Sequence, residues 1–414
     1  MIEILRQRRF RRLFTAQVVA LVGTGLLTVA LGLLAYDLAG SDAGAVLGAA
    51  LTIKMIAYVF VAPVISAVTD RVPRRIVLVG ADSIRAAIAL TLPFVTHTWQ
   101  IYLLIFVLQA ASATFTPAFQ AVIPSILVDE DDYTKGLSLS RLAYDLESLL
   151  SPALAAAVLT VLTYNLLFVA TAAGFIASAS LVMTTALPRP IPTDRSVPLS
   201  RRIARGARFM FDRPVLRGLL AMNLAVGAAT ALVVVDSVVY VRDLLDGSTA
   251  GVALALGCYG GGSMVVALSV PRLLTRVTDR GLMLAGCALL PIGLLLGASI
   301  AALRPSPGPG WLILAVAWVT LGAGTSMVNT PSARLLRAQS TPDVRPAVFT
   351  AQFSLSHACF LLTYPLAGWV GASAGQLTAA TALAVIATLA GTTAARVWPV
   401  DIPSRIEAVP AGRR

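Results

Sequence analysis

The chain has 414 residues, of which 57% are hydrophobic and 13% are charged. Soluble domains carry about 25% charged residues, and a soluble protein of this length could not cover its surface with so few charges. The composition therefore excludes an ordinary soluble fold and indicates that lipid covers the apolar surface. The net charge of +12 does not indicate nucleic-acid binding, because the basic residues fall in short stretches between long apolar runs.

Apolar runs long enough to cross a bilayer as helices follow one another along the chain. A hydrocarbon core of about 30 Å needs about 20 such residues. Twelve runs qualify, near residues 13–37, 46–69, 76–96, 99–123, 138–161, 165–187, 215–241, 249–271, 281–303, 310–333, 346–370 and 375–398. They are too long for membrane strands and lack the alternation of strands. The first run is too long for the apolar part of a signal peptide, so we predict that it is the first spanning helix.

The distribution of positive charge predicts the orientation in the membrane. If both termini lie inside, only Arg242 and Arg304 of the 32 Lys and Arg residues fall in outer loops. Lys54, Arg85 and Arg141 lie within predicted spans, and the others lie in inner stretches. This asymmetry is what the positive-inside rule requires. We therefore predict a multi-pass protein of the cell (inner) membrane with both termini in the cytoplasm.

A polar stretch in the middle of the chain separates two sets of six spans. It covers residues 188–213 and is rich in proline and arginine, so we interpret it as a cytoplasmic linker. The N-terminal half is then 1–187, the C-terminal half is 214–398, and 399–414 form a cytoplasmic tail. Within the linker, residues 199–211 could form an amphipathic helix on the inner leaflet.

Short motifs recur in the same order in the two halves. The pairs are Asp70-Arg71 with Asp279-Arg280, Thr116-Pro117 with Thr330-Pro331, and Ser138-Leu139-Ser140-Arg141 with Ser354-Leu355-Ser356-His357. Their separations are 209, 214 and 216 residues. Because six helices return the chain to the same side, these matches predict two parallel repeats related by an axis along the membrane normal.

The stretch that follows the second span resembles the signature of a known family. Residues 66–75 read SAVTDRVPRR, which resembles the D-R-x-x-R-R motif of the major facilitator superfamily. The family usually has glycine at the position of Ser66 and often at that of Pro73, so only the charged part of the motif is intact. Residues 115–147 are similar to bacterial exporters of this superfamily, in particular to a branch that confers nickel resistance. The resemblance implies an all-α membrane protein with twelve transmembrane helices in two parallel six-helix halves.

The motif itself provides the first candidate functional group. Asp70, Arg71, Arg74 and Arg75 would lie at the inner end, where they could form a charged latch that closes an inner gate. The alternative is simple anchoring by positive charge, although anchoring needs no acidic residue. The acidic run at 129–132 is interpreted instead as a solvated cap of the following helix.

Ionisable side chains within the spans are candidates for proton coupling. They are Lys54, Arg141, Asp145, Glu147, Asp236 and His357. An intramembrane charge is costly unless it is paired or faces water. Arg141 and Asp145 share a helix face and could be no more than an internal ion pair, whereas Glu147 points nearly the opposite way. Either acid could carry a proton.

The other three charged candidates each have two interpretations. Lys54 could meet a carboxylate or an anionic substrate, or its ammonium group could extend to the membrane surface. Asp236 could carry a proton or bind a cation, or it could pair with Arg242. His357 could be protonated during transport, or it could be a hydrogen-bonded packing residue.

Polar residues at similar depths in three spans form the last candidate group. The resemblance implies that these spans surround a central substrate cavity, but the same residues could be hydrogen bonds between helices. They are Gln109, Ser112, Thr116 and Gln120 in the fourth span, Asn223 in the seventh, and Thr325, Ser326 and Asn329 in the tenth.

The sequence lacks the motifs of the main alternative functions. It has no Walker-type phosphate loop, no H-E-x-x-H and no G-x-S-x-G, so we expect no ATP-driven step, no enzyme activity and no catalytic residue. Three cysteines without paired spacing and two histidines predict neither a disulfide nor a metal site, and we expect no cofactor.

We therefore predict a monomeric secondary transporter in the lipid bilayer. Its function would be proton-coupled efflux of a small solute, which could be a drug, a metabolite or a metal ion, by alternating access. A dedicated nickel or divalent-cation exporter, and a receptor or scaffold of the same fold that transports nothing, are the alternatives.

Overall fold

The apolar runs fold into helices, which satisfy every backbone hydrogen bond within the segment, as lipid requires. The computed structural model describes residues 2–39, 43–159, 163–187 and 198–399, and these form helices and turns without a strand. The helices are α1 (Arg8–Ala39), α2 (Ala43–Ile56), α3 (Ala62–Val68), α4 (Arg74–Thr91), α5 (Thr98–Ile126), α6 (Glu130–Leu159), α7 (Tyr164–Met183), α8 (Leu199–Asp212), α9 (Pro214–Val239), α10 (Thr249–Leu273), α11 (Asp279–Leu303), α12 (Pro307–Gln339), α13 (Arg345–Pro365), α14 (Gly371–Ala374) and α15 (Gln376–Val397).

Each predicted span coincides with one helix or with helices joined by an irregular turn. Within the described ranges, nine helices are long and apolar enough to cross a membrane. The other three predicted spans differ in character. Those at 46–69 and 346–370 contain π-helical turns at Ala57–Val61 and Leu366–Val370, and the span at 138–161 is charged in its first half. The structure is consistent with twelve crossings.

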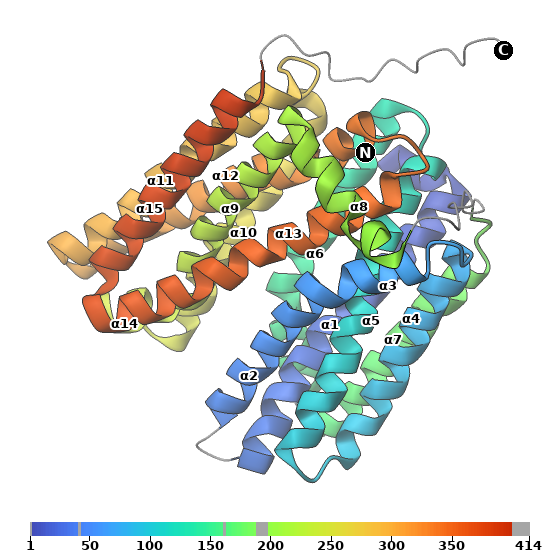
Figure 1. Cartoon of the computed structure of the whole chain (residues 1–414). Helices are drawn as coiled ribbons and strands as arrows, with labels where there is room; N and C mark the ends of the chain where they lie inside the picture. The colour runs from blue at the N-terminus through green and yellow to red at the C-terminus, as the bar shows by residue number, and fades with distance from the viewer. Residues whose placement is uncertain (1, 40–42, 160–162, 188–197, 400–414) are drawn as a thin grey trace.

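The helices are arranged as two bundles that meet along one side (Figure 1). α1 to α7 form the first bundle, in which α7 packs against α1 and α4, and α9 to α15 form the second, in which α12 packs against α10 and α11. The bundles touch through α6 with α10 and through α3 with α13. They lie close together near α8 and diverge towards the opposite end, and α1 begins at the same end at which α15 ends.

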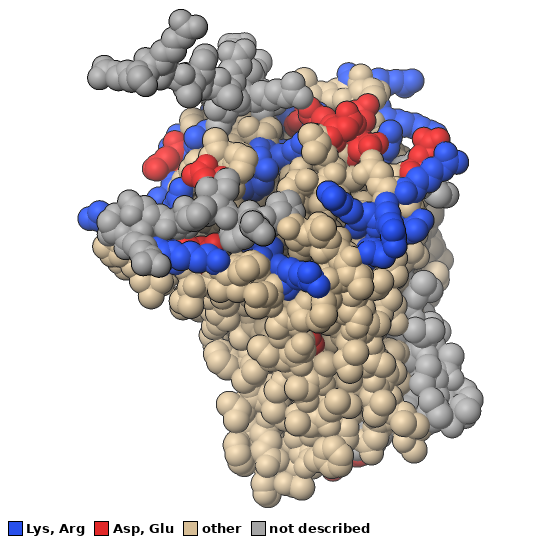
Figure 2. All heavy atoms as spheres, turned by 90° about the vertical axis from the view of Figure 1, so that its right-hand side faces the viewer, with Lys and Arg blue, Asp and Glu red and all other residues tan. Residues whose placement is uncertain are grey.

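Charged side chains gather at the end of the molecule that carries α8, here called the basic end (Figure 2). Its loops and helix ends contain Arg71, Arg75, Arg205, Arg276 and Arg337. Away from it the surface is apolar, and large side chains such as Phe60, Val265 and Leu389 are 60%, 66% and 61% exposed. Continuous exposed apolar surface of this kind needs hydrocarbon as its solvent. The chain is therefore a multi-pass membrane protein.

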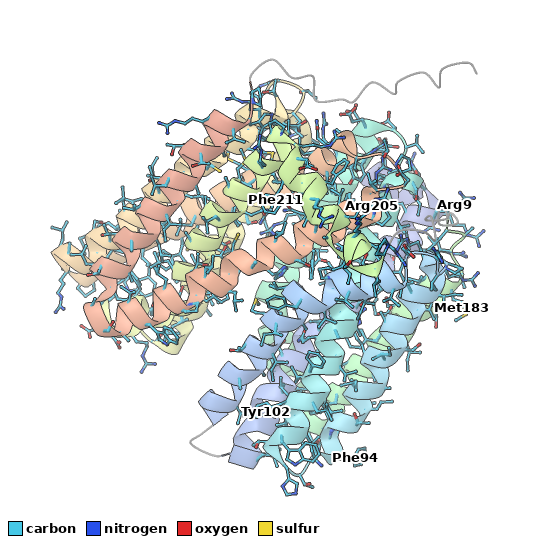
Figure 3. All side chains as sticks on the ribbon, viewed as in Figure 1. Arg9, Phe94, Tyr102, Met183, Arg205 and Phe211 are labelled. Atoms are coloured by element: carbon cyan, nitrogen blue, oxygen red, sulfur yellow. The ribbon has the colours of Figure 1, made fainter. Side chains whose placement is uncertain are left out.

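The predicted amphipathic helix at 199–211 is confirmed as α8, but α8 does more than lie on the membrane surface. It crosses the junction of the two bundles, where Figure 3 shows Arg205, far from Phe94 and Tyr102 at the opposite end. Gly206 is buried against α13, and a Cβ atom there would come within 2.0 Å of the Ala347 carbonyl oxygen. Residues 188–197 of the predicted linker and 400–414 of the predicted tail lie outside the described residues.

Two glycines let α10 and α12 approach closely in the second bundle. A Cβ atom at Gly322 would lie 1.9 Å from the Tyr259 carbonyl oxygen, and one at Gly262 would lie 2.2 Å from the Val319 carbonyl oxygen. Small residues at such crossings are the usual basis of tight helix packing in membranes. Because the opposing atoms belong to the backbone, the helices themselves would have to separate to admit a side chain.

We therefore expect Gly322→Ala to destabilise the second bundle by about 1–3 kcal/mol, the usual cost of overpacking. The measurement is the thermal unfolding midpoint of the purified protein in detergent. Gly257→Ala is the matched control, because a Cβ atom at Gly257 of α10 meets nothing within 4 Å. Equal midpoints for the two variants would contradict this account of the helix crossing.

Candidate functional site

A cavity of about 760 Å³ lies between the two bundles. Helices α1, α2, α5 and α6 line it on one side, and α9, α12 and α13 line it on the other. Its volume falls in the range of small-molecule sites, about 300–1,000 Å³. The walls extend from Leu31 and Ala50 to Leu137 and Leu336, which are nearer the basic end. Mostly apolar walls with a few polar groups suit an organic solute.

Most of the polar residues predicted for a cavity do line it. They are Gln109, Ser112, Thr116 and Gln120 of α5, Asn223 of α9 and Asn329 of α12. Thr325 and Ser326 do not, because α12 reaches the cavity only from Asn329 onwards. Thr325 and Ser326 are 2% and 0% exposed, and the Ser326 hydroxyl is 3.1 Å from that of Thr330.

Lys54 and Glu147 bring opposite charges into the cavity from α2 and α6. The Lys54 Nζ atom is 5.6 Å from the centroid of the Tyr58 ring, and its charge interacts with that of Glu147. The interpretation in which Lys54 extends to the membrane surface is therefore wrong. Since Lys54 and Glu147 line one cavity, a bound proton or substrate charge would change the electrostatic environment of both side chains.

Arg141 and Asp145 form the expected ion pair, with Arg141 Nη2 2.9 Å from Asp145 Oδ1. The pair is more than local, because it holds Ser263 of α10 in the other bundle. Arg141 Nη2 donates to Ser263 Oγ at 3.0 Å, and Ser263 Oγ donates to Asp145 Oδ2 at 2.7 Å. Ser263, which follows the Gly260-Gly261-Gly262 run, was not among the predicted site residues.

His357 lines the cavity and belongs to an aromatic cluster that joins the bundles. Its ring centroid is 4.8 Å from that of Tyr58 in the first bundle and 4.4 Å from that of Phe353 in the second. The Nδ1 atom lies 2.7 Å from the Phe353 carbonyl oxygen, to which it donates. The contacts are those of a hydrogen-bonded packing residue at the edge of the cavity.

Two further cavity groups were not predicted. Gln352 exchanges two hydrogen bonds with Asn223, at 3.0 and 3.1 Å, which ties α13 to α9. Arg85 forms an ion pair with Asp82, and its Cζ atom also lies 4.3 Å from the ring centroid of Phe115 and 4.4 Å from that of Phe175. This cation–π stacking offsets part of the free-energy cost of placing a guanidinium group in the membrane.

Asp236 lies outside the cavity, in the second bundle and away from the basic end. It is 2% exposed, and its Oδ1 atom accepts a hydrogen bond of 3.3 Å from Gln376 Nε2 of α15. Arg242, the partner that we considered, is exposed on the turn after α9.

The motif after the second span contacts the linker helix. Asp70 pairs with Arg202 of α8, whose Nη2 atom is 2.6 Å from Asp70 Oδ1, and Arg202 also donates to the Ala67 carbonyl. Arg74 lines a smaller cavity of about 470 Å³ beside this pair, while Arg71 and Arg75 are exposed. The motif is therefore joined to the linker helix through Asp70, and its role as a latch stays a prediction.

The linker helix also bonds to the second bundle. Arg205 Nη2 is 3.0 Å from Asp343 Oδ2, and Asp343 Oδ1 accepts a hydrogen bond of 2.5 Å from Thr341. Partial burial raises the pKa of Asp343, but the Thr341 hydroxyl and the Arg205 guanidinium outweigh it and hold this pKa below its ordinary value. Asp343 is therefore ionised at neutral pH, and α8 holds one acid from each bundle.

A direct charge contact between the bundles forms around Arg334 of α12. Its Nη2 atom is 2.7 Å from Glu130 Oε1 of α6, its Nη1 atom donates to Thr134 Oγ1 at 3.1 Å, and its Nε atom is 3.4 Å from Asp279 Oδ1. Asp129 caps α6 as expected, since its Oδ1 atom accepts from the Asp132 N–H at 2.9 Å. Glu130, however, is a bundle-to-bundle partner rather than a solvated cap.

Further contacts close the same end. Arg337 donates to the carbonyl oxygens of Leu127 and Val128, at 3.2 and 2.5 Å, and Tyr133 donates to the Ala333 carbonyl at 3.2 Å. These contacts lie between the cavity and the basic end. As for metals, no group of three or more His, Cys, Asp or Glu side chains within the described ranges is placed to hold an ion.

Comparisons with known proteins agree with this architecture. Residues 13–307, more than half of the chain, match the family described as Major Facilitator Superfamily. Macrolide efflux protein A of Streptococcus pyogenes is 27% identical over 186 residues, 44% of this chain and 45% of that protein. YfiS, an uncharacterized MFS-type transporter of Bacillus subtilis, is 25% identical over 334 residues, 75% of each chain.

A solved structure extends the likeness to the whole fold. The crystal structure of a bacterial homologue of the iron transporter ferroportin, in its outward-facing state, has a TM-score of 0.77 at 13% sequence identity, and the match covers 94% of this chain and 98% of that one. The chain spans about half the length of macrolide efflux protein A. The predicted fold class is confirmed, and the protein is not an enzyme. On the family match and the fold together, this chain belongs to the Major Facilitator Superfamily of membrane transporters.

Proposed function

We propose that the protein exports an amphiphilic organic solute from the cytoplasm in exchange for protons, by alternating access of the central cavity. The observation that carries the proposal is the cavity between the bundles, with its apolar walls and its facing Lys54 and Glu147. Export of an organic solute is supported by the likeness to macrolide efflux protein A, which covers 45% of that protein. A dedicated nickel exporter gains no support from the described side chains, which offer no three-ligand cluster.

The moving bodies in this proposal are 1–187 and 214–398, joined by 188–213. The basic end faces the cytoplasm of a cell whose inner membrane holds the protein as a monomer. In the present conformation the contacts of Arg334, Arg337 and Tyr133 close the basic end, and the bundles diverge at the other end. This arrangement corresponds to an outward-facing state, from which solute leaves the cell.

Proton coupling follows from the charges in the cavity. Glu147 and Lys54 attract each other when the acid is ionised, and protonation of Glu147 removes that attraction. A solute that binds near either group would then compete with the proton, which is the requirement for exchange. Arg141 and Asp145, bonded to Ser263 across the interface, act in this proposal as a joint between the bundles.

Sealed inside-out vesicles test the function directly. With an acidic lumen we expect accumulation of a macrolide antibiotic, and a protonophore should abolish it. A chemically altered solute would indicate an enzyme. No flux across a broad panel of drugs and metal ions would favour a receptor or scaffold and would contradict the proposal.

We expect Glu147→Gln to abolish accumulation driven by the pH gradient while exchange of solute across the membrane continues, because the amide cannot release a proton. Counterflow and gradient-driven uptake in the same vesicles separate the two activities. Asp131→Asn, at an exposed position of the same helix, is the control. Unaltered pH dependence in Glu147→Gln would exclude this residue as the proton carrier.

We expect Arg334→Gln to raise the population with an open basic end by about fivefold, because a network of partly buried pairs contributes about 1 kcal/mol. Spin labels on cysteines introduced at Val128 and Val277, with the three native cysteines replaced by alanine, would report the distance across this end. Arg276→Gln, at an exposed position, is the control. Identical distance distributions in the two variants would count against a gating role.

We expect Asp70→Asn to slow transport several-fold with normal membrane insertion, because it removes the acid that anchors α8 to the first bundle. If the contact with Arg202 is what matters, the exchange Asp70→Arg with Arg202→Asp should recover part of the rate. A wild-type rate in Asp70→Asn would show that the pair has no part in transport.

A further inference from the structure

Asp236 and Gln376 form a polar pair inside an otherwise apolar part of the second bundle. The Gln376 amide nitrogen donates to Asp236 Oδ1 at 3.3 Å. The other two oxygens of the pair, Asp236 Oδ2 and Gln376 Oε1, are buried and have no hydrogen-bond partner. Buried polar atoms are rarely left in this state, so the two orphaned acceptors require an explanation.

Asp236 forms no ion pair within the described residues, although helices packed against α9 carry cationic groups. Arg272 lies in the last turn of α10, Arg345 begins α13 and donates to the Ser340 carbonyl, His357 of α13 lines the cavity, and Arg304 is exposed after α11. Segments 281–303, 311–333 and 366–395 contain no Asp, Glu, Lys, Arg or His. Tyr240 lies one helical turn after Asp236, and its hydroxyl is buried without a hydrogen-bond partner. Arg242 and Asp243 are exposed on the turn that follows.

The neighbouring hydroxyl group is already engaged elsewhere. Ser237 donates to the Val233 carbonyl and accepts from the Trp318 indole nitrogen at 2.8 Å. An ionised Asp236 would therefore be a buried carboxylate held by one amide hydrogen, which is an expensive state.

One proton on the carboxyl group accounts for both orphaned oxygens. A carboxylic acid and a primary amide are complementary, since the amide N–H donates to one acid oxygen and the acid O–H donates to the amide oxygen. The first of these bonds is present, and a proton on Asp236 would supply the donor that the second requires. A metal cation fits less well, because hard cations take six or more oxygen ligands and this pocket offers far fewer.

The position of Gln376 gives the pair a route to solvent. Gln376 begins α15, is half-buried, and follows the exposed residues 372–375. Gly371 leaves room for the amide, because a Cβ atom there would lie 2.8 Å from Gln376 Nε2 and 3.4 Å from Asp236 Oδ1. Movement of a single side chain would thus connect Asp236 to the solution at the end opposite the basic end.

We propose that Asp236 and Gln376 form a proton-binding site outside the central cavity, which exchanges protons with the compartment at the end opposite the basic end. Nothing in this proposal depends on the nature of the exported solute or on the direction of transport. The site is separate from the cavity, in which neither residue takes part.

Infrared difference spectroscopy of the protein in lipid vesicles tests the site without a transport assay. A protonated carboxyl group has a carbonyl stretching band that ionised carboxylates lack. At neutral pH we expect one such band in the wild type that is lost in Asp236→Asn and shifts on transfer to heavy water. Asp82→Asn is the matched control, because Asp82 is equally buried but paired with Arg85, and the band should persist there.

Gln376→Leu provides an independent variant that keeps the acid. Without the amide the protonated-carboxyl band should still be present. Its frequency should shift because the hydrogen bond to Oδ1 is gone, and the pH at which it disappears should rise because the ionised carboxylate loses its one amide hydrogen. The proposal is overturned if wild type and Asp236→Asn have the same spectra at all pH values, or if Gln376→Leu leaves both the frequency and the pH midpoint unchanged. Removal of the band by added sodium ions would assign the site to a cation and would also overturn it.

Discussion

A charge inside a hydrocarbon layer must find a counter-charge or water, and this requirement organises the interior of the protein. Arg85 is held within the first bundle by Asp82 and two aromatic rings. Arg141 and Asp145 satisfy each other and extend to Ser263 across the interface. Lys54 and Glu147 face the cavity. Arg85 thus finds its partners within one bundle, whereas Arg141, Asp145, Lys54 and Glu147 lie at the interface or the cavity between the two bundles.

The ion pairs at the basic end differ between the two halves of the chain. In the second repeat, Asp279 meets Arg334 of its own bundle, and the same arginine reaches Glu130 of the other. The residue 214 positions before Arg334 is Gln120, so the first repeat has no equivalent cation. The linker helix fills that role, since α8 contributes Arg202 to Asp70 and Arg205 to Asp343. Both halves thus contribute acids to the ion pairs at the basic end, and the arginines come from different parts of the chain.

The features predicted correctly from the sequence are those that depend on residues close together in the chain. Span lengths, the amphipathic linker helix and the Arg141–Asp145 pair depend on composition or on helical spacing, and all three are present. Sequence reasoning failed for partners on other helices, such as Ser263 and Gln352, because periodicity gives the face of a helix but not which residue of a neighbour meets it. The assignment of Thr325 to the cavity assumed that similar depth means a similar environment. The turns of α12 before Asn329 instead pack between α10 and α11, where Gly322 and Gly324 permit close contact.

The distribution of apolar contacts explains how such a molecule could change shape at low cost. One large hydrophobic cluster fills the second bundle, and three others lie within the first. Among the side chains that the structure describes, the cluster that joins the bundles is small, with Ala62 and Ala113 on one side and Phe353 on the other. Rocking of the bundles would therefore expose little of this described apolar surface. Most of its free-energy cost would come from breaking polar contacts, which water can replace. Arginine contacts at the basic end hold the interface between the bundles in place of a continuous apolar core. Such a core would fix one conformation.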